Sequence, residues 1–517
     1  MNKIISHKYS IYIFLFLFSF LFNFYYGYRG ILPIDSFLIF DSGYFVLKGE
    51  YPFRDFWTIT GPLLDYLQSF FFYIFGINWS SYVIHASLIN FILVIFSYFF
   101  FKKLGLNKLY SILYSVGVSI LAYPSIGTPF PDHHAFIFSL IAVYFMILAT
   151  IEKKNYYYFF VTLFLFLSFL SKQVNSFYLT IFFSLIIFIN IFLTKEKNLN
   201  NIFYFILGGL IPLTIFFIFL KITNTPLQNF FIQYILYPAS IGTERIQQLK
   251  FDLKEVFGQF KFIYFAVLPA IIIFFYNIFN SKKKVLNKIE TNIFIIFVGS
   301  IFIFLYSQLL TKNQILIFSL IPVCIAFSHR SIMKFYNKNY LIYLILIIFL
   351  YSTFKYHIRF NENKKFMELE KINIENSVDG VGIDDSLSRL KWINHLYPKN
   401  PLKETILLKQ SLNLLKLEKN NKIVITDYQF ASTLIENEYS SPNKWHDIRS
   451  VPSKKNKFYS EYKNFFLNKL KKNKVKKIYF IGQYKEIFFL SLLDEKSCTK
   501  RTQINELLSV HDVENCT

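Results

Sequence analysis

Long apolar segments separated by short polar ones occupy the first 355 residues of the chain. A helix needs about 20 predominantly apolar residues to cross a hydrocarbon core of about 30 Å. Five runs come close to that length: Tyr9 to Tyr28, Ser80 to Phe101, Phe177 to Leu193, Ile202 to Leu220 and Tyr340 to Phe354. Because backbone groups in lipid must be satisfied within their own segment, these runs predict transmembrane α-helices.

The composition favours a membrane protein and excludes an ordinary soluble one. Apolar residues make up 54% of the 517 residues and aromatic residues 21%, and the mean hydropathy is +0.39. A soluble fold could not hide this much apolar surface from water. The first run is too long for a signal peptide and lacks a small-residue cleavage site, so we expect it to be retained as a signal anchor.

The basic residues predict how the chain is oriented in the membrane. The formal net charge is +23, and the Lys and Arg residues gather at alternate helix ends, in the segments 101–108, 151–155, 194–197, 281–288 and 329–338. This is the positive-inside pattern, which explains the charge without a nucleic acid partner. With these segments and the N-terminus in the cytoplasm, we expect about eleven spans and a C-terminus outside. The expected spans are 9–28, 80–101, 107–123, 135–150, 156–171, 174–194, 202–220, 261–280, 292–310, 314–329 and 340–355.

A change to polar sequence after the last expected span predicts a second domain. We expect residues 1–355 to form the membrane domain and residues 356–517 to form a small extracytoplasmic α/β domain. Strand-like runs occur at 422–429 and 476–484, and each is followed by a plausible helix. The chain is therefore expected to be a polytopic α-helical membrane protein with a small soluble α/β domain on its outer side.

Two features of the C-terminal segment leave alternatives open. Cys498 and Cys516 lie near the end of an outward-facing domain, where a disulfide between them is sterically and chemically plausible but not required. The basic run 469–477 is either a solvated helix end or a contact for anionic groups. We expect the solvated helix end.

Acidic residues are concentrated in the segment after the first span, residues 29–79. The whole chain has 32 Asp and Glu residues against 55 Lys and Arg residues. Acids beside a membrane helix are costly and are functional candidates by default. The topology expected from the basic segments alone places this loop outside, together with the loops 124–134 and 221–260. The acids of the first loop are Asp35, Asp41, Glu50, Asp55 and Asp65.

The sequence DSGYFVLKGEYPFRDFWTITGPL in this loop resembles the first outer loop of the GT-C fold glycosyltransferases. These polytopic enzymes take a sugar from a polyprenyl-phosphate carrier. In the family an acidic residue follows the first span, and then come a Tyr, a Gly-x-x-Pro-like turn and a Pro-Leu that starts an amphipathic helix on the membrane surface. The segments 170–178 and 312–327 are similar to the family's Lys at a helix end and its Lys-then-Pro late span. The matching loop positions are Asp41, Tyr44, Gly49, Pro52, Gly61, Pro62 and Leu63.

The resemblance singles out Asp41 as a catalytic residue, and the chemistry of sugar transfer agrees with it. An inverting displacement needs a carboxylate that takes the proton of the acceptor hydroxyl. Partial desolvation at the membrane boundary would raise the pKa of Asp41 toward that role. Two alternatives stay open: Asp41 only caps a helix, or Asp35 or Asp55 is the base instead of binding substrate. Glu50 and Asp65 are expected at the surface of the loop helices.

Asp132, His133 and His134 stand at the start of a predicted helix in the second outer loop, after two prolines. Asp132 could cap that helix, the three side chains could contact phosphate or acceptor, or they could ligate a divalent metal, as in some oligosaccharyltransferase relatives. Adjacent residues point in different directions, so we do not expect all three on one ion. In the resemblance the acid here is a second active-site carboxylate, and Asp132 is predicted to be catalytic.

A phosphate leaving group develops negative charge, which an outward-facing cation must meet. Lys172, with Gln173 beside it, lies at the outer end of one expected span, and Lys312 lies at the outer end of another. Arg245 lies on a long loop that could close over the site. For each cation the alternative is a side chain that only reaches the membrane interface.

These features predict a membrane glycosyltransferase that moves a sugar from a polyprenyl-phosphate donor to an extracytoplasmic lipid, glycan or protein acceptor, with Tyr44 among the residues that bind substrate. The expected location is a bacterial inner membrane. The chain lacks a Gly-rich nucleotide loop, which argues against a nucleotide-sugar donor. The alternative is a transporter or flippase of a lipid-linked saccharide, although transporters usually place charges near the bilayer midplane.

Overall fold

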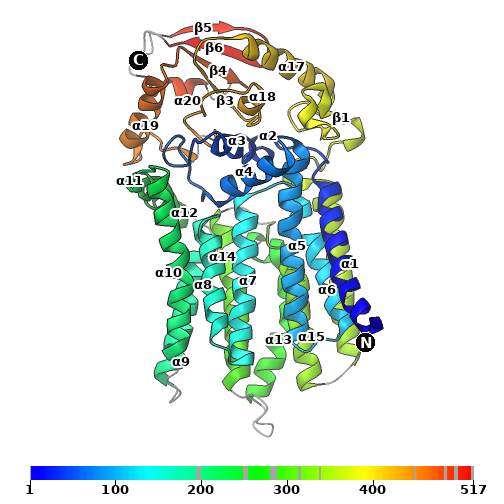
Figure 1. The fold of residues 1–517 in the computed structure, drawn as a ribbon. Coiled ribbons are helices and arrows are strands. Elements are labelled where there is room, and N and C mark those ends of the chain that lie inside the picture. Colours follow the sequence, from blue (N-terminus) through cyan, green and yellow to red (C-terminus); the bar gives the residue numbers. More distant parts are fainter. Residues whose placement is uncertain are drawn as a thin grey trace.

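The computed structural model shows a helical bundle with a small sheet at one end (Figure 1). Eight of the helices in the described part of the chain are long and apolar enough to cross a membrane. These helices are α1 (Asn2–Tyr26), α5 (Trp79–Lys103), α7 (Pro131–Glu152), α9 (Gln173–Leu193), α10 (Leu199–Ile222), α13 (Gln259–Phe279), α14 (Lys288–Thr311) and α16 (Asn339–Tyr356). The described residues are 2–193, 199–247, 254–279, 288–311, 316–336, 339–447, 450–482, 486–493 and 499–513.

The other three expected spans are shorter helices in the same bundle (Figure 1): α6 (Lys108–Leu121), α8 (Tyr156–Phe169) and α15 (Leu320–Phe335). They contain 14, 14 and 16 residues, which corresponds to about 21 to 24 Å of helix. The expected total of about eleven spans therefore corresponds to eight long helices and three short ones. Whether the short helices cross the membrane stays a prediction.

Short helices cover the end of the bundle nearest the sheet (Figure 1): α2 (Pro33–Ser36), α3 (Phe40–Leu47), α4 (Leu63–Phe75), α11 (Leu227–Phe230) and α12 (Tyr237–Gln247). Helix α4 starts at the Pro-Leu pair and is amphipathic, as the sequence predicts. Leu64, Gln68 and Phe72 are four residues apart and are buried on one face, while Phe70 and Tyr73 on the other face are exposed. This spacing lets α4 lie across the end of the bundle with one face buried and apolar side chains exposed on the other.

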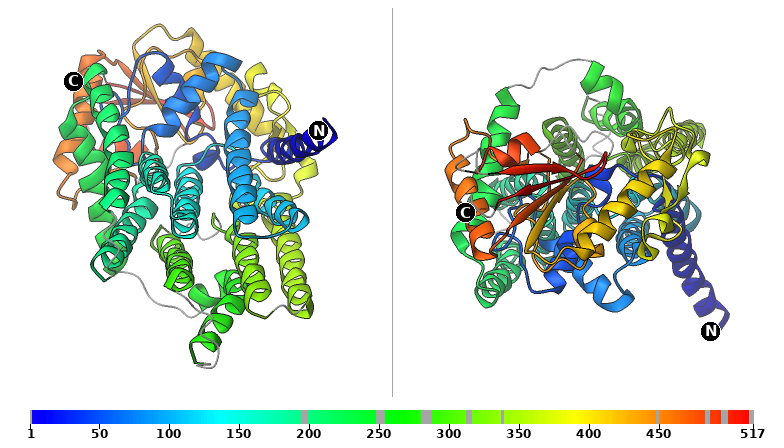
Figure 2. Two further views of the ribbon diagram at one scale, coloured as in Figure 1. Left: turned by 60° about the horizontal axis from the view of Figure 1, so that its bottom comes forward. Right: turned by 90° about the horizontal axis from the view of Figure 1, so that it is seen from above.

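A four-stranded sheet in the C-terminal part lies over the same end (Figure 2). Strands β3 (Lys422–Thr426) and β4 (Lys477–Ile481) run parallel to each other, and they fall within the two strand-like runs of the sequence. Antiparallel β6 (Leu508–Asp512) and β5 (Lys500–Gln503) complete the order β3-β4-β6-β5. The remaining elements of this part are β1 (Val378–Asp379), β2 (Lys391–Trp392), α17 (Pro401–Leu417), α18 (Ala431–Leu434), α19 (Tyr459–Lys472) and α20 (Glu486–Leu490). A domain boundary at residue 355 stays a prediction.

Acids of the loop 29–79 join the bundle to the C-terminal part. The carboxylate of Asp41 accepts hydrogen bonds from the backbone N–H (2.9 Å) and the hydroxyl (2.6 Å) of Thr433 in α18. Glu50 accepts a hydrogen bond from the Ser440 N–H (2.6 Å) and forms an ion pair with Lys469 of α19 (2.8 Å). The sequence predicted Glu50 at the surface and the basic run 469–477 as a solvated helix end. Both predictions are wrong at this contact, because Glu50 and Lys469, the first lysine of the run, pair with each other.

Asp65 is also buried, although the sequence predicted it at the surface. Its carboxylate lies 2.7 Å from the ammonium group of Lys444, and the two side chains are 0% and 1% exposed. Ser42 donates a hydrogen bond of 2.6 Å to the same carboxylate. A buried charge needs a partner of opposite charge, and the partner of Asp65 comes from a segment 379 residues away in the sequence. This ion pair holds the C-terminal part against α4.

Candidate active site

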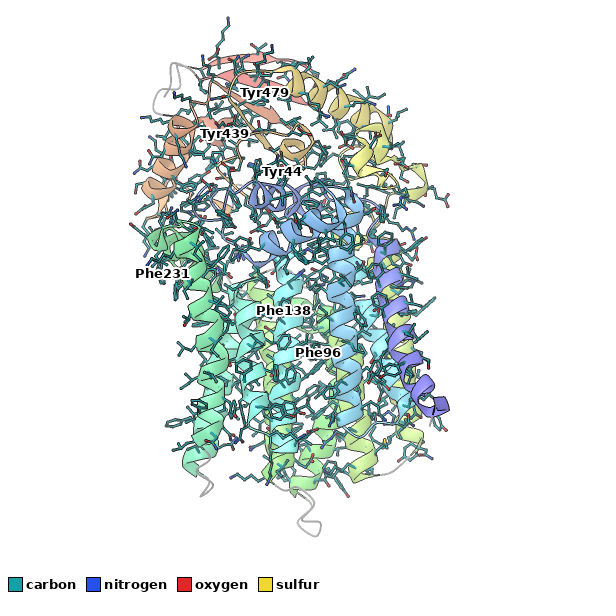
Figure 3. The ribbon with its side chains drawn as sticks, viewed as in Figure 1. Tyr44, Phe96, Phe138, Phe231, Tyr439 and Tyr479 are labelled. Carbon is teal, nitrogen blue, oxygen red and sulfur yellow. The ribbon has the colours of Figure 1, made fainter. Side chains whose placement is uncertain are left out.

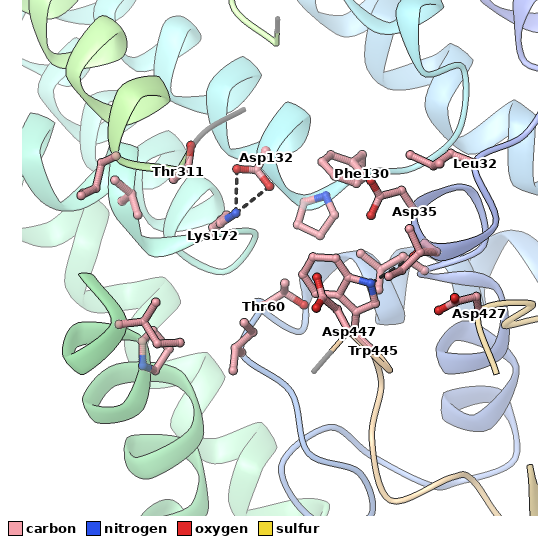
Figure 4. Close-up of a pocket in the computed structure, with 18 of the residues that line it drawn as sticks. Leu32, Asp35, Thr60, Phe130, Asp132, Lys172, Thr311, Asp427, Trp445 and Asp447 are labelled. Carbon is pink, nitrogen blue, oxygen red and sulfur yellow. Dashed lines mark hydrogen bonds and ion pairs between the residues drawn. The ribbon is translucent and has the colours of Figure 1, made fainter. Parts of the chain in front are cut away.

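A cavity of about 510 Å³ lies where the bundle, α2, α12 and the C-terminal part meet (Figure 4). Its size is within the usual range of ligand pockets, about 300 to 1,000 Å³. The walls combine apolar residues with charged and polar side chains from distant parts of the chain. The residues used below are Asp35, Asp132, Lys172, Gln173, Arg245, Glu368, His395, Asp427, Trp445 and Asp447.

One wall of the cavity carries an ion pair between α7 and the segment before α9. Asp132 is in the first turn of α7, after the extended Phe130 and the helix-starting Pro131. The Lys172 ammonium donates hydrogen bonds to both carboxylate oxygens of Asp132, each at 2.7 Å (Figure 4). The pair fixes a cation at the end of the bundle where a lipid head group would lie.

The loop 29–79 approaches this wall at Gly61. The Gly61 N–H donates to the Ser171 carbonyl at 3.0 Å, and a Cβ atom at Gly61 would come within 1.8 Å of the Leu170 carbonyl oxygen. Glycine is therefore required for this close approach. Nearby, the Gln173 side chain donates to the backbone carbonyls of Ile59 and Tyr234. Gln173 thus ties the loop to the helical segment that leads to α12.

Three carboxylates line the cavity on the side of the sheet: Asp35 from α2, Asp427 directly after β3, and Asp447 (Figure 4). Burial, with smaller contributions from the negative charges of Asp447 and Asp35, raises the pKa of Asp427 to about 7. Trp445 donates a hydrogen bond of 3.0 Å from its indole N–H to the Ile34 carbonyl and so links this loop to α2. We call Asp35, Asp427 and Asp447 the cavity carboxylates.

Five residues predicted for the site do line the cavity: Asp35, Asp132, Lys172, Gln173 and Arg245. They come from α2, α7, the start of α9 and α12, segments that lie apart in the sequence. Their common location agrees with the expectation that the unusual polar residues gather at one end of the bundle.

Three predicted residues of the first loop lie elsewhere. Asp41 does not line the cavity, since its carboxylate binds Thr433; burial raises its pKa to about 6 against the lowering effect of these hydrogen bonds. Tyr44 is buried in the apolar core beside α4. Asp55 accepts hydrogen bonds from the Tyr51 N–H (2.8 Å) and the Arg54 guanidinium (2.7 Å), so it fixes the loop.

The two predicted histidines do not line the cavity. His134 is within hydrogen-bond distance of His85, with 3.1 Å between their Nε2 atoms, and it also bonds the Tyr123 hydroxyl. The His133 ring packs on Tyr123, with 4.7 Å between the ring centroids. Lys312, Cys498 and Cys516 lie outside the described residues, so the predictions for them are untested.

The residues predicted as metal ligands, Asp132, His133 and His134, do not form a metal site in the structure. Among the described residues, no three His, Cys, Asp or Glu side chains are grouped to hold a metal ion. Asp132, the acid proposed as a ligand, holds the Lys172 ammonium with both oxygens, and the adjacent histidines bond and pack within the bundle. We therefore derive no chemical step through a metal.

Sequence reasoning missed the residues that the C-terminal part contributes: Glu368, His395, Asp427, Trp445 and Asp447. One signal was available, because Asp427 lies near the C-terminal end of the predicted strand-like run 422–429, and ligand sites of α/β sheets lie beyond the carboxyl ends of parallel strands. Trp445 and Asp447 belong to an irregular segment. No periodicity marks such a segment as part of a site.

No protein-family model matches the sequence, and no curated protein matches it. Among solved structures, the chain is similar to the oligosaccharyltransferase of Archaeoglobus fulgidus. Its complex with Zn and sulfate matches with a TM-score of 0.44 and 14% identity, over 91% of this chain and 68% of that chain. Its apo form matches with a TM-score of 0.49 and 12% identity, over 91% and 69%. Its complex with an inhibitory peptide and a dolichol-phosphate, under the name AglB, gives 0.48 and 12%, over 94% and 71%.

All three solved structures are of this oligosaccharyltransferase. The identities are 12% to 14% and the TM-scores lie below 0.5. At this level the similarity alone does not establish what the chain binds or does. The activity has to be argued from the residues of the cavity.

The raised pKa of Asp427 predicts how stability depends on pH. The pKa of about 7 in the folded protein lies above the usual 3.8, so the folded state binds this proton more tightly than the unfolded state. The stabilisation that this bound proton provides is complete below about pH 4 and is lost as the pH rises through about 7. Asp427→Asn should therefore increase the unfolding free energy more at pH 8 than at pH 5, by on the order of 2–4 kcal/mol. The melting temperature should rise more at pH 8 accordingly.

Thermal unfolding of the purified protein at the two pH values measures this effect. Asp385→Asn, which changes an exposed carboxylate of the same part of the chain, is the matched control and should show no such difference. An equal gain at pH 5 and pH 8 for Asp427→Asn would contradict the prediction.

Proposed function

We propose that the chain is a membrane glycosyltransferase that moves a sugar from a polyprenyl-phosphate carrier to an acceptor hydroxyl or amide in this cavity. The observation that carries the proposal is the meeting of Lys172 and Arg245 with the cavity carboxylates at one end of a membrane bundle. A lipid-linked donor can reach such a place from the bilayer, and a polar acceptor can reach it from the aqueous side. The reaction needs both groups there: a cation for the phosphate and a carboxylate for the acceptor.

Lys172 and Arg245 are proposed to meet the phosphate of the carrier. As the bond between sugar and phosphate breaks, negative charge grows on the leaving oxygen, and a fixed cation stabilises that charge more than it stabilises the ground state. The Asp132 carboxylate orients the Lys172 ammonium at 2.7 Å, and that ammonium has a third N–H with which to bind the phosphate. Arg245 on α12 borders the same cavity. In this proposal Asp132 is a positioning residue, not the base.

Asp35 is proposed as the general base. It lines the cavity together with the other two cavity carboxylates (Figure 4). The negative charge of Asp35 contributes to the raised pKa of Asp427, so the two carboxylates lie close enough to interact. The acceptor proton goes to this group as the acceptor oxygen or nitrogen forms its bond to the sugar carbon and the carrier phosphate leaves. This replaces Asp41, which lies outside the cavity.

The side of the membrane follows from the charge pattern of the sequence. If the basic segments lie in the cytoplasm, the cavity and the sheet face outward. The acceptor is then an extracytoplasmic lipid, glycan or protein, and the membrane is proposed to be a bacterial inner membrane. Trp445, with its ring at the cavity, offers an apolar face on which a sugar or acceptor group can pack.

Transfer from defined carriers tests the proposal. Purified protein in vesicles is incubated with a panel of radiolabelled polyprenyl-phosphate sugars and with cell-envelope lipid, glycan and protein fractions. The expected result is label in one acceptor fraction through a bond that survives organic extraction of the carrier. A transporter or flippase would instead move the labelled carrier or sugar across the vesicle membrane and form no new glycosidic bond, and that result would overturn the proposal.

Lys172→Gln is expected to lower kcat by about 10²-fold or more, because a preorganised cation for the leaving group is lost. Lys172→Arg should keep part of the activity, since it keeps the charge. Steady-state kinetics with varied donor measure the effect. Lys48→Gln, at an exposed lysine of the same loop region, is the matched control and should act like the wild type. Unchanged kcat in Lys172→Gln would show that this cation does not meet the phosphate.

A further inference from the structure

A second cavity, open to the surface of the helical bundle, lies between α1, α5, α7 and α8. Its volume is about 560 Å³. All ten lining residues are aromatic or aliphatic; from α1 and α5 they include Tyr12 and Phe96, and from α7 and α8 they include Phe145, Phe160 and Leu163. Phe96 lies among the bundle helices, well away from the sheet (Figure 3). Such a cavity in lipid suits a hydrocarbon chain.

Fixed cations stand at the rim of this cavity. Lys103, at the end of α5, lies 2.6 Å from Glu152, and Lys154 lies 3.0 Å from the same carboxylate. Their ammonium groups lie over two rings that line the cavity, at 5.5 Å from the centroid of Phe99 and 5.9 Å from that of Tyr156. The lysine side chains are 40% and 48% exposed, so each can still reach a ligand at the mouth.

The rim has an excess of positive charge. Lys102 and Lys153 adjoin the two paired lysines in the sequence, so these segments carry four lysines and one glutamate. Glu152 neutralises one charge and also holds the lysines in place. Basic pockets between transmembrane helices bind the phosphates of anionic lipids. The rim therefore favours an anionic head group over a zwitterionic one.

This rim is separate from the candidate active site. Helix α7 begins at Pro131 beside the first cavity and ends at Glu152, a length of 22 residues. That length of helix spans about 33 Å. The charged rim and the first cavity are therefore at opposite ends of the bundle, and the two sites can be tested independently.

We propose that this second cavity binds one anionic phospholipid, with an acyl chain between α1, α5, α7 and α8 and the phosphate at the exposed side of Lys103 and Lys154. The lipid fills a space that no side chain of the described residues occupies, and its phosphate offsets the charge at the rim. It stabilises the packing of α1 against the bundle at the end away from the active site.

Native mass spectrometry of the full-length protein in detergent tests the proposal. Phosphatidylglycerol and phosphatidylcholine with the same acyl chains are titrated separately. The wild type should hold one phosphatidylglycerol about tenfold more tightly than phosphatidylcholine, because the lysines at the rim attract an anionic head group. Lys103→Gln combined with Lys154→Gln should abolish this preference. Leu163→Trp, which fills the cavity, should weaken binding of both lipids.

Lys108→Gln is the matched control, because Lys108 is an exposed lysine at the same end of the bundle and does not line the cavity. Equal affinity of the wild type for the two lipids would overturn the proposal, whatever the variants do. So would a preference for phosphatidylglycerol that survives in the double variant, or displacement of that lipid by an equal concentration of polyprenyl phosphate.

Discussion

Asp35→Asn is expected to reduce sugar transfer by about 10²- to 10⁴-fold, the contribution typical of a general base. The amide cannot take the acceptor proton, but it has nearly the same shape and can still line the cavity. Binding of the carrier lipid should change little, because the cations that meet its phosphate are intact. Initial rates at saturating donor, together with a separate measurement of carrier binding, distinguish the two effects.

Asp41→Asn is the matched control, since it changes an acid of the same loop that lies outside the cavity. An asparagine oxygen can accept the two hydrogen bonds that Thr433 now donates to Asp41, so transfer should stay within a few-fold of the wild type. The reverse outcome, with Asp41→Asn inactive and Asp35→Asn active in equally folded protein, would restore Asp41 as the base and reject the assignment made from the cavity.

Lys444→Met is expected to destabilise the protein by about 3–5 kcal/mol, because it leaves the Asp65 carboxylate buried without its partner. Both side chains of the pair are almost completely buried, so water cannot replace the lost ammonium. The second change Asp65→Leu should recover most of the loss, since an apolar pair of similar size needs no ionic partner. Chemical or thermal unfolding of the detergent-solubilised variants measures these changes.

An exposed ion pair provides the comparison. Lys403 lies 2.6 Å from Glu506, and the two side chains are 47% and 62% exposed. Lys403→Met should therefore cost no more than about 1 kcal/mol. If Lys444→Met cost as little as Lys403→Met, the ion pair would not be what holds the C-terminal part against α4.

The membrane part of the fold was largely predictable from the sequence, because the membrane restricts what an apolar run can form. The eight long helices coincide with expected spans, and α4 starts at the predicted Pro-Leu pair. The run 422–429 contains β3, and the run 476–484 contains β4. In each case the signal is local: a run of apolar residues, or an alternation bounded by turns, is present within one segment.

The location of five site residues was also predictable, for a less local reason. Basic segments at alternate helix ends indicate which end of each helix lies on the cytoplasmic side. Polar residues at the opposite ends are then expected together on the other side. The sequence therefore predicts Asp132, Lys172 and Arg245 at one end of the bundle. The direct contact between Lys172 and Asp132 was not predicted, because the two residues are 40 positions apart.

The acid-rich loop marks the limit of this reasoning. A carboxylate beside a membrane helix can serve catalysis or can pair with a cation, and the two uses look alike in sequence. Asp41, Glu50 and Asp65 bind Thr433, Lys469 and Lys444, at least 379 residues further along the chain. Of the five acids, Asp35 is the one that lines the cavity.

The sequence by itself determined that the chain is a helical membrane protein, with its unusual polar residues at one end and a small sheet after the helices. These properties depend on composition and on periods of a few residues. Only the tertiary structure decided which acids face the cavity and which hold the C-terminal part in place. That choice depends on contacts between distant segments, and a buried charge can reveal its partner only once the chain is folded.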